Sequence, residues 1–82
     1  MPEGQLTVDD VRGMLAASPP GARWLMGDDP GHKPGYDNTA CLWRRADGSW
    51  FVAWFERGSY FDEQVFASES DACRAFLGLL GH

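Results

Sequence analysis

The sequence has few of the residues on which protein chemistry most often depends. Its 82 residues contain two cysteines, two histidines and a single lysine, Lys33. Two cysteines do not make the disulfide framework that is usual in a small secreted domain. Cys41 and Cys73 both lie in apolar segments, so we expect buried, reduced thiols. A zinc site needs clustered Cys and His at fixed spacings, and none occurs. We therefore predict no metal site and no cofactor.

Catalytic and nucleotide-binding motifs are also lacking. His32 lies in a Gly/Pro-rich loop and His82 is terminal, so pairing either with a cysteine nucleophile would be arbitrary. The acidic segment 27–38 lacks the ligand order of an EF-hand, and its isolated glycines do not form a phosphate-binding loop. These absences predict that the protein is not an enzyme.

Long hydrophobic runs and basic charge are scarce as well. No stretch approaches the about 18 apolar residues of a membrane span, and the N-terminus lacks the pattern of a signal peptide. We therefore expect a cytoplasmic protein. The net charge is −5, from twelve acidic and seven basic residues. Such a chain repels nucleic acid and anionic membranes, and it favours a basic protein partner. A simpler alternative is that the acidity only aids solubility.

The patterns that are present predict one α+β domain over residues 1–82. Thr7 and Ser68 are good helix N-caps, each followed by an apolar stripe, which indicates helices at about 7–17 and 69–80. Turn-forming residues indicate a loop at about 27–38. Strands are expected at about 39–45, 50–57 and 60–66. The predicted fold is a two-layer sandwich with both helices on one face of a three-stranded antiparallel meander, or a four-stranded sheet if the apolar run at 22–27 joins it.

Hairpin turns at Asp47-Gly48 and Gly58-Ser59 would fix which strand residues share a face. The larger apolar face, which we expect under the helices, then holds Cys41, Trp43, Trp50, Val52, Trp54, Phe61 and Val65. The second face holds Ala40, Leu42, Phe51, Ala53, Phe55, Tyr60 and Phe66. Two alternatives remain open: the segment 22–27 covers the second face, or a slip in register exchanges the two faces.

The second face mixes aromatic and charged residues, which is typical of a protein interface. We therefore predict a partner-binding surface on it, assisted by acidic residues of the loop 27–38, or else binding by that loop itself. The predicted partner-binding residues are Arg44, Phe51, Phe55, Arg57, Tyr60, Asp62, Asp28 and Asp29. For the protein itself we expect a monomer or a weak homodimer.

The segment from residue 50 to residue 80 resembles a pattern of small bacterial proteins. Residues 50–58 read WFVAWFERG, and the helix from Ser68 reads SESDACRAFLGLL. A Trp-containing strand ending in Glu-Arg-Gly, then a helix opening with Ser-Glu-x-x-Ala-Cys, is similar to immunity proteins of polymorphic or contact-dependent toxin systems. The resemblance implies a protein that covers the active site of a cognate toxin. Positions equivalent to Phe51 and Phe55 are often polar in that pattern, and this departure favours a partner on their face. The alternative function is a small accessory or structural subunit that docks on another bacterial or phage protein.

Overall fold

Two capped helices stand near the ends of the chain in the computed structural model, which describes residues 5–81. Helix α1 (Val8–Ala17) begins with a capping box, because Thr7 Oγ1 accepts from Asp10 N at 3.2 Å and the Asp10 carboxylate accepts from Thr7 N at 3.0 Å. Helix α2 (Glu69–Leu79) is capped by Ser68, whose Oγ accepts from Asp71 N at 3.3 Å. None of the helices within residues 5–81 is long and apolar enough to cross a membrane.

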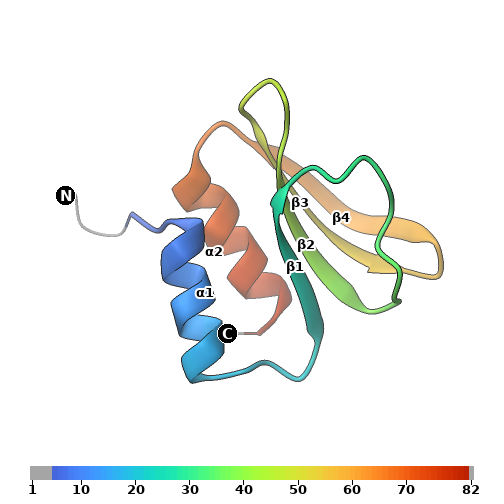
Figure 1. Cartoon of the computed structure of the whole chain (residues 1–82), viewed down its shortest axis with the longest axis horizontal. Helices are drawn as coiled ribbons and strands as arrows, with labels where there is room; N and C mark the ends of the chain where they lie inside the picture. Colours follow the sequence, from blue (N-terminus) through green and yellow to red (C-terminus); the bar gives the residue numbers. More distant parts are fainter. Residues whose placement is uncertain (1–4, 82) are drawn as a thin grey trace.

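Four strands form one mixed sheet in the order β1-β2-β3-β4. They are β1 (Arg23–Asp28), β2 (Thr39–Arg44), β3 (Trp50–Glu56) and β4 (Ser59–Phe66). Strands β2, β3 and β4 make the predicted antiparallel meander, and β1 joins as a fourth strand, parallel to β2. Both helices lie on one face of the sheet (Figure 1), so the predicted α+β two-layer fold is confirmed.

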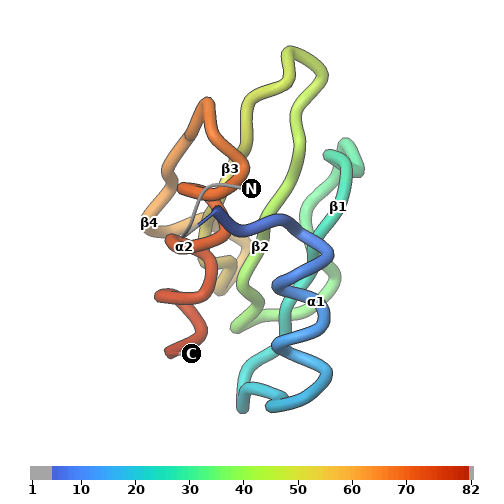
Figure 2. The backbone as a smooth tube through the Cα atoms, turned by 90° about the vertical axis from the view of Figure 1, so that its left-hand side faces the viewer, coloured from blue at the N-terminus to red at the C-terminus, as the bar shows by residue number. Residues whose placement is uncertain are grey.

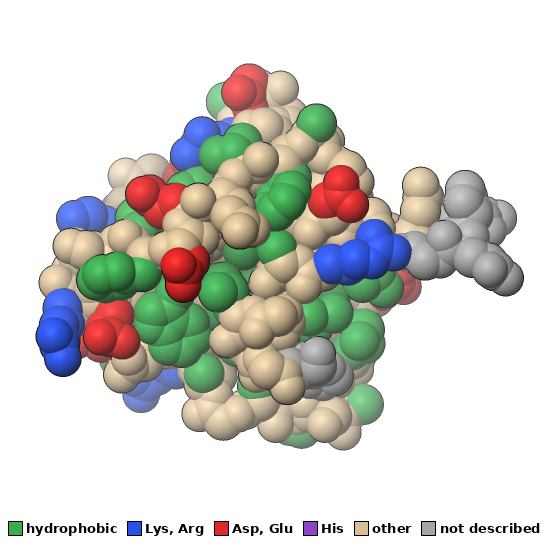
Figure 3. Space-filling model, turned by 180° about the vertical axis from the view of Figure 1, so that it is seen from behind, with side chains coloured by type: hydrophobic (Ala, Val, Ile, Leu, Met, Phe, Trp, Pro, Cys, Tyr) green, Lys and Arg blue, Asp and Glu red, His purple; other side chains and the backbone are tan. Residues whose placement is uncertain are grey.

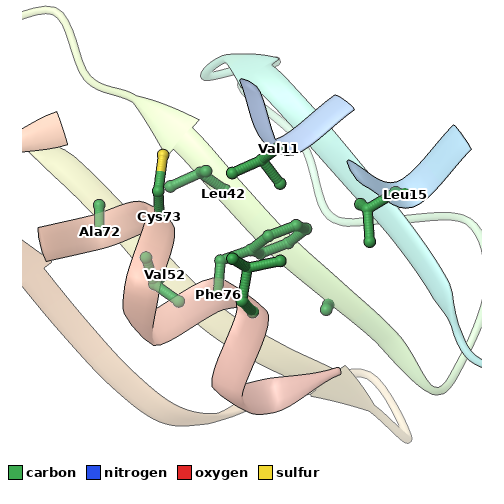
Figure 4. Packing of buried hydrophobic residues seen from close by; sticks show 9 residues of the cluster. Val11, Leu15, Leu42, Val52, Ala72, Cys73 and Phe76 are labelled. Carbon is green, nitrogen blue, oxygen red and sulfur yellow. The ribbon is translucent and has the colours of Figure 1, made fainter. Parts of the chain in front are cut away.

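The two helices run side by side (Figure 2). Hydrogen bonds join their N-terminal ends. Leu6 N donates to Ser70 Oγ at 3.0 Å, and Val8 N donates to the Glu69 carboxylate at 2.8 Å. The main core lies between these helices and the sheet, with Phe76 as its largest fully buried side chain (Figure 4). Its other fully or nearly fully buried members are Val11, Leu15, Ala40, Leu42, Val52, Ala72, Cys73 and Leu77.

The β2–β3 connection corrects the predicted assignment of the faces. Arg45 N donates to Ser49 O at 2.8 Å and Gly48 N donates to Arg45 O at 3.0 Å, which makes a three-residue loop with Gly48 at φ 87°. The predicted two-residue turn at Asp47-Gly48 is therefore wrong by one residue. Because side chains alternate between the two faces of a sheet, the difference of one residue exchanges the faces of the β2 side chains relative to those of β3.

As a result, Trp43 and Cys41 lie on the face away from the helices, whereas Ala40 and Leu42 lie in the main core. Trp50 and Trp54 pack against the helix-covered core as predicted, each half-buried. Of the three tryptophans expected there, only Trp43 was placed on the wrong face.

The β3–β4 hairpin departs from prediction in two ways. Its two-residue turn is Arg57-Gly58, with φ of 54° and 77°, instead of Gly58-Ser59. A register shift then follows opposite Ala53, where Asp62 takes φ 54° and forms a β-bulge. Beyond the bulge, Phe66 pairs with Trp50 and Val65 with Phe51. The predicted faces of Phe66 and Val65 are therefore exchanged.

The loop of residues 29–38 lies on the side of the sheet away from the helices (Figure 1). Two hydrogen bonds attach it to the β3–β4 turn: Lys33 Nζ donates to Gly58 O at 2.8 Å, and Arg57 N donates to Asp37 Oδ1 at 3.1 Å. A second apolar cluster is buried on this face, made of Cys41, Trp43, Phe51, Ala53 and Phe55. The second face is thus covered, by this loop and not by the segment 22–27.

Candidate functional site

The two phenylalanines predicted as binding anchors are buried. Phe51 and Phe55 are each 5% exposed, so neither offers a free surface to a partner. Both support Tyr60, whose ring meets theirs edge-to-face at centroid distances of 5.3 Å and 5.4 Å. The expectation of an exposed Phe51/Phe55 face is therefore wrong. What these rings do is fix the position of the half-buried Tyr60 at the surface above them.

Tyr60 lies at the edge of a hollow of about 370 Å³ between the loop and the sheet. Burial raises the pKa of the Tyr60 hydroxyl above its usual value, as do the charges of Cys41, Asp29 and Glu63, while a hydrogen bond from Trp43 opposes them. Among the residues that line the hollow are Asp29, Lys33, Arg45, Phe51, Tyr60 and Glu63. The structure thus brings together three predicted site residues, Asp29, Phe51 and Tyr60, and adds Glu63.

The remaining predicted residues are dispersed. Asp28 and Arg44 line a separate hollow of about 480 Å³ at the end of the sheet, which Asp29 and Arg45 also border. Arg57 is exposed in the β3–β4 turn, and its guanidinium lies 3.7 Å from the Glu56 carboxylate. The predicted set is therefore not one continuous patch.

Strand β4 carries an exposed surface of which the sequence analysis predicted only Tyr60 and Asp62. Phe61 is 48% exposed and Val65 is 54% exposed, whereas most large apolar side chains of the described residues are covered. Asp62 and Glu63 lie between them, both exposed, and the strand is an edge of the sheet. Viewed from behind, where β4 lies, the surface shows apolar side chains interspersed with acidic ones (Figure 3). We call Tyr60, Phe61, Asp62, Glu63 and Val65 the β4 surface.

The signal for this surface was present in the sequence but was hidden by the bulge. Strict alternation placed Phe61 and Val65 together on the core side. Asp62 at positive φ adds one residue to β4, so Phe61 and Val65 lie on opposite faces and flank the edge. Bulges are common at sheet edges, and Asp tolerates the left-handed conformation, but neither fact marks the position in advance.

The titratable groups of the domain show two strongly shifted thiols. Burial raises the pKa of Cys41 to about 12, and burial together with Glu69 and Asp10 raises that of Cys73 to about 11. Both are free and buried, as predicted. Across residues 5–81, no three His, Cys, Asp or Glu side chains are placed to hold a metal ion. Comparisons with protein-family models, with curated proteins and with solved structures found no match.

Proposed function

We propose that this protein is a non-catalytic binding module of the immunity-protein type, which neutralises a cognate bacterial toxin in the cytoplasm by covering its active site. The observation that carries the proposal is the β4 surface. Exposed Phe61 and Val65 flank exposed Asp62 and Glu63 on an open sheet edge. An exposed aromatic residue beside polar and charged ones is typical of sites where proteins meet. The resemblance of residues 50–80 to immunity proteins supports the same function.

The charge of the β4 surface favours a basic partner. Asp62 and Glu63 belong to a chain of net charge −5. A toxin that acts on a polyanion has a basic cleft, and carboxylates entering it imitate the substrate. Apolar anchors supply most of the affinity in such interfaces, whereas exposed acids mainly raise the association rate. Phe61 and Val65 therefore have the anchoring role, and the two carboxylates have the steering role.

The bulge at Asp62 limits how the edge is used. A partner strand cannot pair with β4 along its whole length, because the bulge leaves one residue without a counterpart. Acidic side chains and bulges also protect edge strands from aggregation. Recognition therefore depends on the side chains of the β4 surface, with Tyr60 held in place by Phe51 and Phe55.

The test begins with a search of the neighbouring genes for a toxin domain, which is then produced together with this protein. Co-expression with the wild-type protein should restore growth, and titration should give a one-to-one complex. Phe61→Ala should weaken binding about thirtyfold, since a single aromatic anchor is worth about 2 kcal/mol. The matched control is Tyr36→Ala, because Tyr36 is a 64% exposed aromatic residue on the loop and outside the β4 surface. Equal affinity of Phe61→Ala and wild type would exclude this surface as the binding site.

The charged residues have a separate signature. The double variant Asp62→Asn/Glu63→Gln should slow association, most strongly at low ionic strength, and should change the dissociation rate little. Stopped-flow measurements at two salt concentrations distinguish these effects. A partner whose association is independent of salt would contradict the role of the carboxylates.

A further inference from the structure

The opposite edge of the sheet, β1, lacks the protection that β4 has. It is a six-residue strand whose only neighbour is β2. Natural edge strands are usually interrupted by bulges, inward-pointing charges or prolines. The register of β1 with β2 is regular from Arg23 to Asp28, and its charges lie at its two ends. Residues 24–27 between them read Trp-Leu-Met-Gly.

The backbone groups of alternate residues point to the open side of β1. Asp29 N donates to Arg44 O at 3.0 Å on the β2 side, whereas Met26 O accepts from Arg12 Nη2 at 3.3 Å on the other side. Because successive residues direct their backbone groups to opposite sides, Trp24, Met26 and Asp28 present theirs to the open edge. Within residues 5–81, a single side chain, that of Arg12, bonds to this edge, and that residue is exposed. Another strand can therefore pair here once Arg12 moves aside.

We propose that β1 pairs antiparallel with β1 of a second copy of this chain, about a two-fold axis at Met26, so that one sheet continues through both copies. In this register the outward-pointing residues face each other: Met26 faces its own counterpart, and Trp24 faces Asp28 of the second copy. Two-fold symmetry perpendicular to the sheet keeps the helices of both copies on the same side.

The side chains on the loop-covered face are complementary in the same register. Leu25, which is 42% exposed, faces Gly27 of the second copy. A Cβ built on Gly27 would have no heavy atom within 4 Å, so open space lies above it. Leu25 of each copy fills the space above Gly27 of the other. Side chains that face each other across antiparallel strands are the contacts that stabilise such pairing.

The charges at the two ends of the strand complete the match. Arg23 faces Asp29 of the second copy, and symmetry repeats this ion pair. Each group is already held: the Arg23 guanidinium lies 4.4 Å from the centre of the Tyr36 ring, and Asp29 Oδ1 accepts from Gly31 N at 2.9 Å. A register shifted by two residues in either direction places Arg23 opposite a glycine instead. Charge therefore selects the second copy as occupant and Met26 as the centre.

Charge exchange tests the pairing directly. In sedimentation equilibrium, the wild-type mass should rise with concentration from 9.1 kDa toward twice that value. Arg23→Asp alone and Asp29→Arg alone each place like charges together in a self-pair, so each should associate on the order of tenfold more weakly. An equimolar mixture of the two variants should associate again, because every new aspartate then faces a new arginine.

Two further variants keep the test decisive. Arg57→Asp is the matched control, since it reverses an exposed charge in the β3–β4 turn, away from the β1 edge, and should leave association unchanged. If Asp29→Arg disturbs the loop, the variant Leu25→Asp is used in its place. Leu25→Asp should abolish association while its circular dichroism spectrum remains that of the wild type. A wild-type mass of 9.1 kDa at all concentrations overturns the proposal. So does a mixture that associates no better than its components.

Discussion

Replacing Phe76 and Phe61 by alanine compares the same chemical change at two very different positions. Phe76 is 0% exposed and lies between α1, α2 and the sheet (Figure 4), whereas Phe61 is 48% exposed on β4. Burial of a phenylalanine side chain stabilises by about 1.5–3 kcal/mol, and a closed cavity raises the cost of truncation to about 3–5 kcal/mol. Phe61→Ala loses about half of the transfer term and leaves no closed cavity, so we expect about 0.5–1.5 kcal/mol.

The measurement is urea unfolding followed by tryptophan fluorescence, with the midpoint and slope fitted for each variant. A domain of 82 residues has a free energy of unfolding of about 4–12 kcal/mol, so Phe76→Ala removes a quarter or more of it. The melting temperature should then fall by at least about 12 °C, at about 4–8 °C for each kcal/mol. Equal losses in the two variants would refute the burial assigned to Phe76. A larger loss in Phe61→Ala would also show that its binding effect cannot be separated from folding.

Three other changes test the hairpin, the loop and the thiols. Arg57→Asn should raise the free energy of unfolding by about 0.5–1 kcal/mol, because Asn accepts φ of 54° before Gly58 more readily; unchanged stability would contradict the type I′ turn. Asp37→Ala removes the acceptor of Arg57 N and should cost about 1 kcal/mol in urea unfolding, with faster reaction of Cys41 with a thiol reagent as the loop loosens. The pKa values of Cys41 and Cys73 in the folded state are about 12 and about 11, against an ordinary thiol value of 9.0. The stability that the two protonated thiols contribute is therefore complete below pH 9 and is lost as the pH rises through 11–12. The free energy of unfolding of the double variant Cys41→Ala/Cys73→Ala should therefore fall less steeply above pH 9 than that of the wild type. The same pH dependence in both proteins would contradict this.

Local sequence signals were sufficient for the elements themselves. Thr7 and Ser68 accept hydrogen bonds from backbone N–H groups three residues later, so they determine where the helices begin without reference to the rest of the chain. The helix stripes contain Val11, Leu15 and Phe76, which are buried as their spacing predicts. The apolar stripe of each helix has to pack against an apolar face of the sheet, so the fold has one layer of helices and one layer of strands.

The candidate site depended on details that local patterns do not specify. One residue more or less in a hairpin loop reverses every side chain of a strand, and both Asp47-Gly48 and a three-residue loop ending in Gly48 satisfy the same sequence. The loop 29–38 is polar and rich in glycine and proline, so nothing in its composition predicts that it covers Phe51 and Phe55. That coverage arises from contacts distant in sequence, such as Lys33 with Gly58.

The sequence by itself therefore determined the helices, the three strands of the meander, the buried thiols and the acidic charge, because each depends on neighbouring residues or on composition alone. Only the tertiary structure decided which aromatic residues are exposed. The loop 29–38 buries Phe51 and Phe55, and the bulge at Asp62 moves Val65 to the face opposite Phe61, with both side chains in solvent. The physical reason is that strand side chains alternate with a period of two, so a shift of one residue anywhere along a hairpin exchanges inside and outside for all that follows.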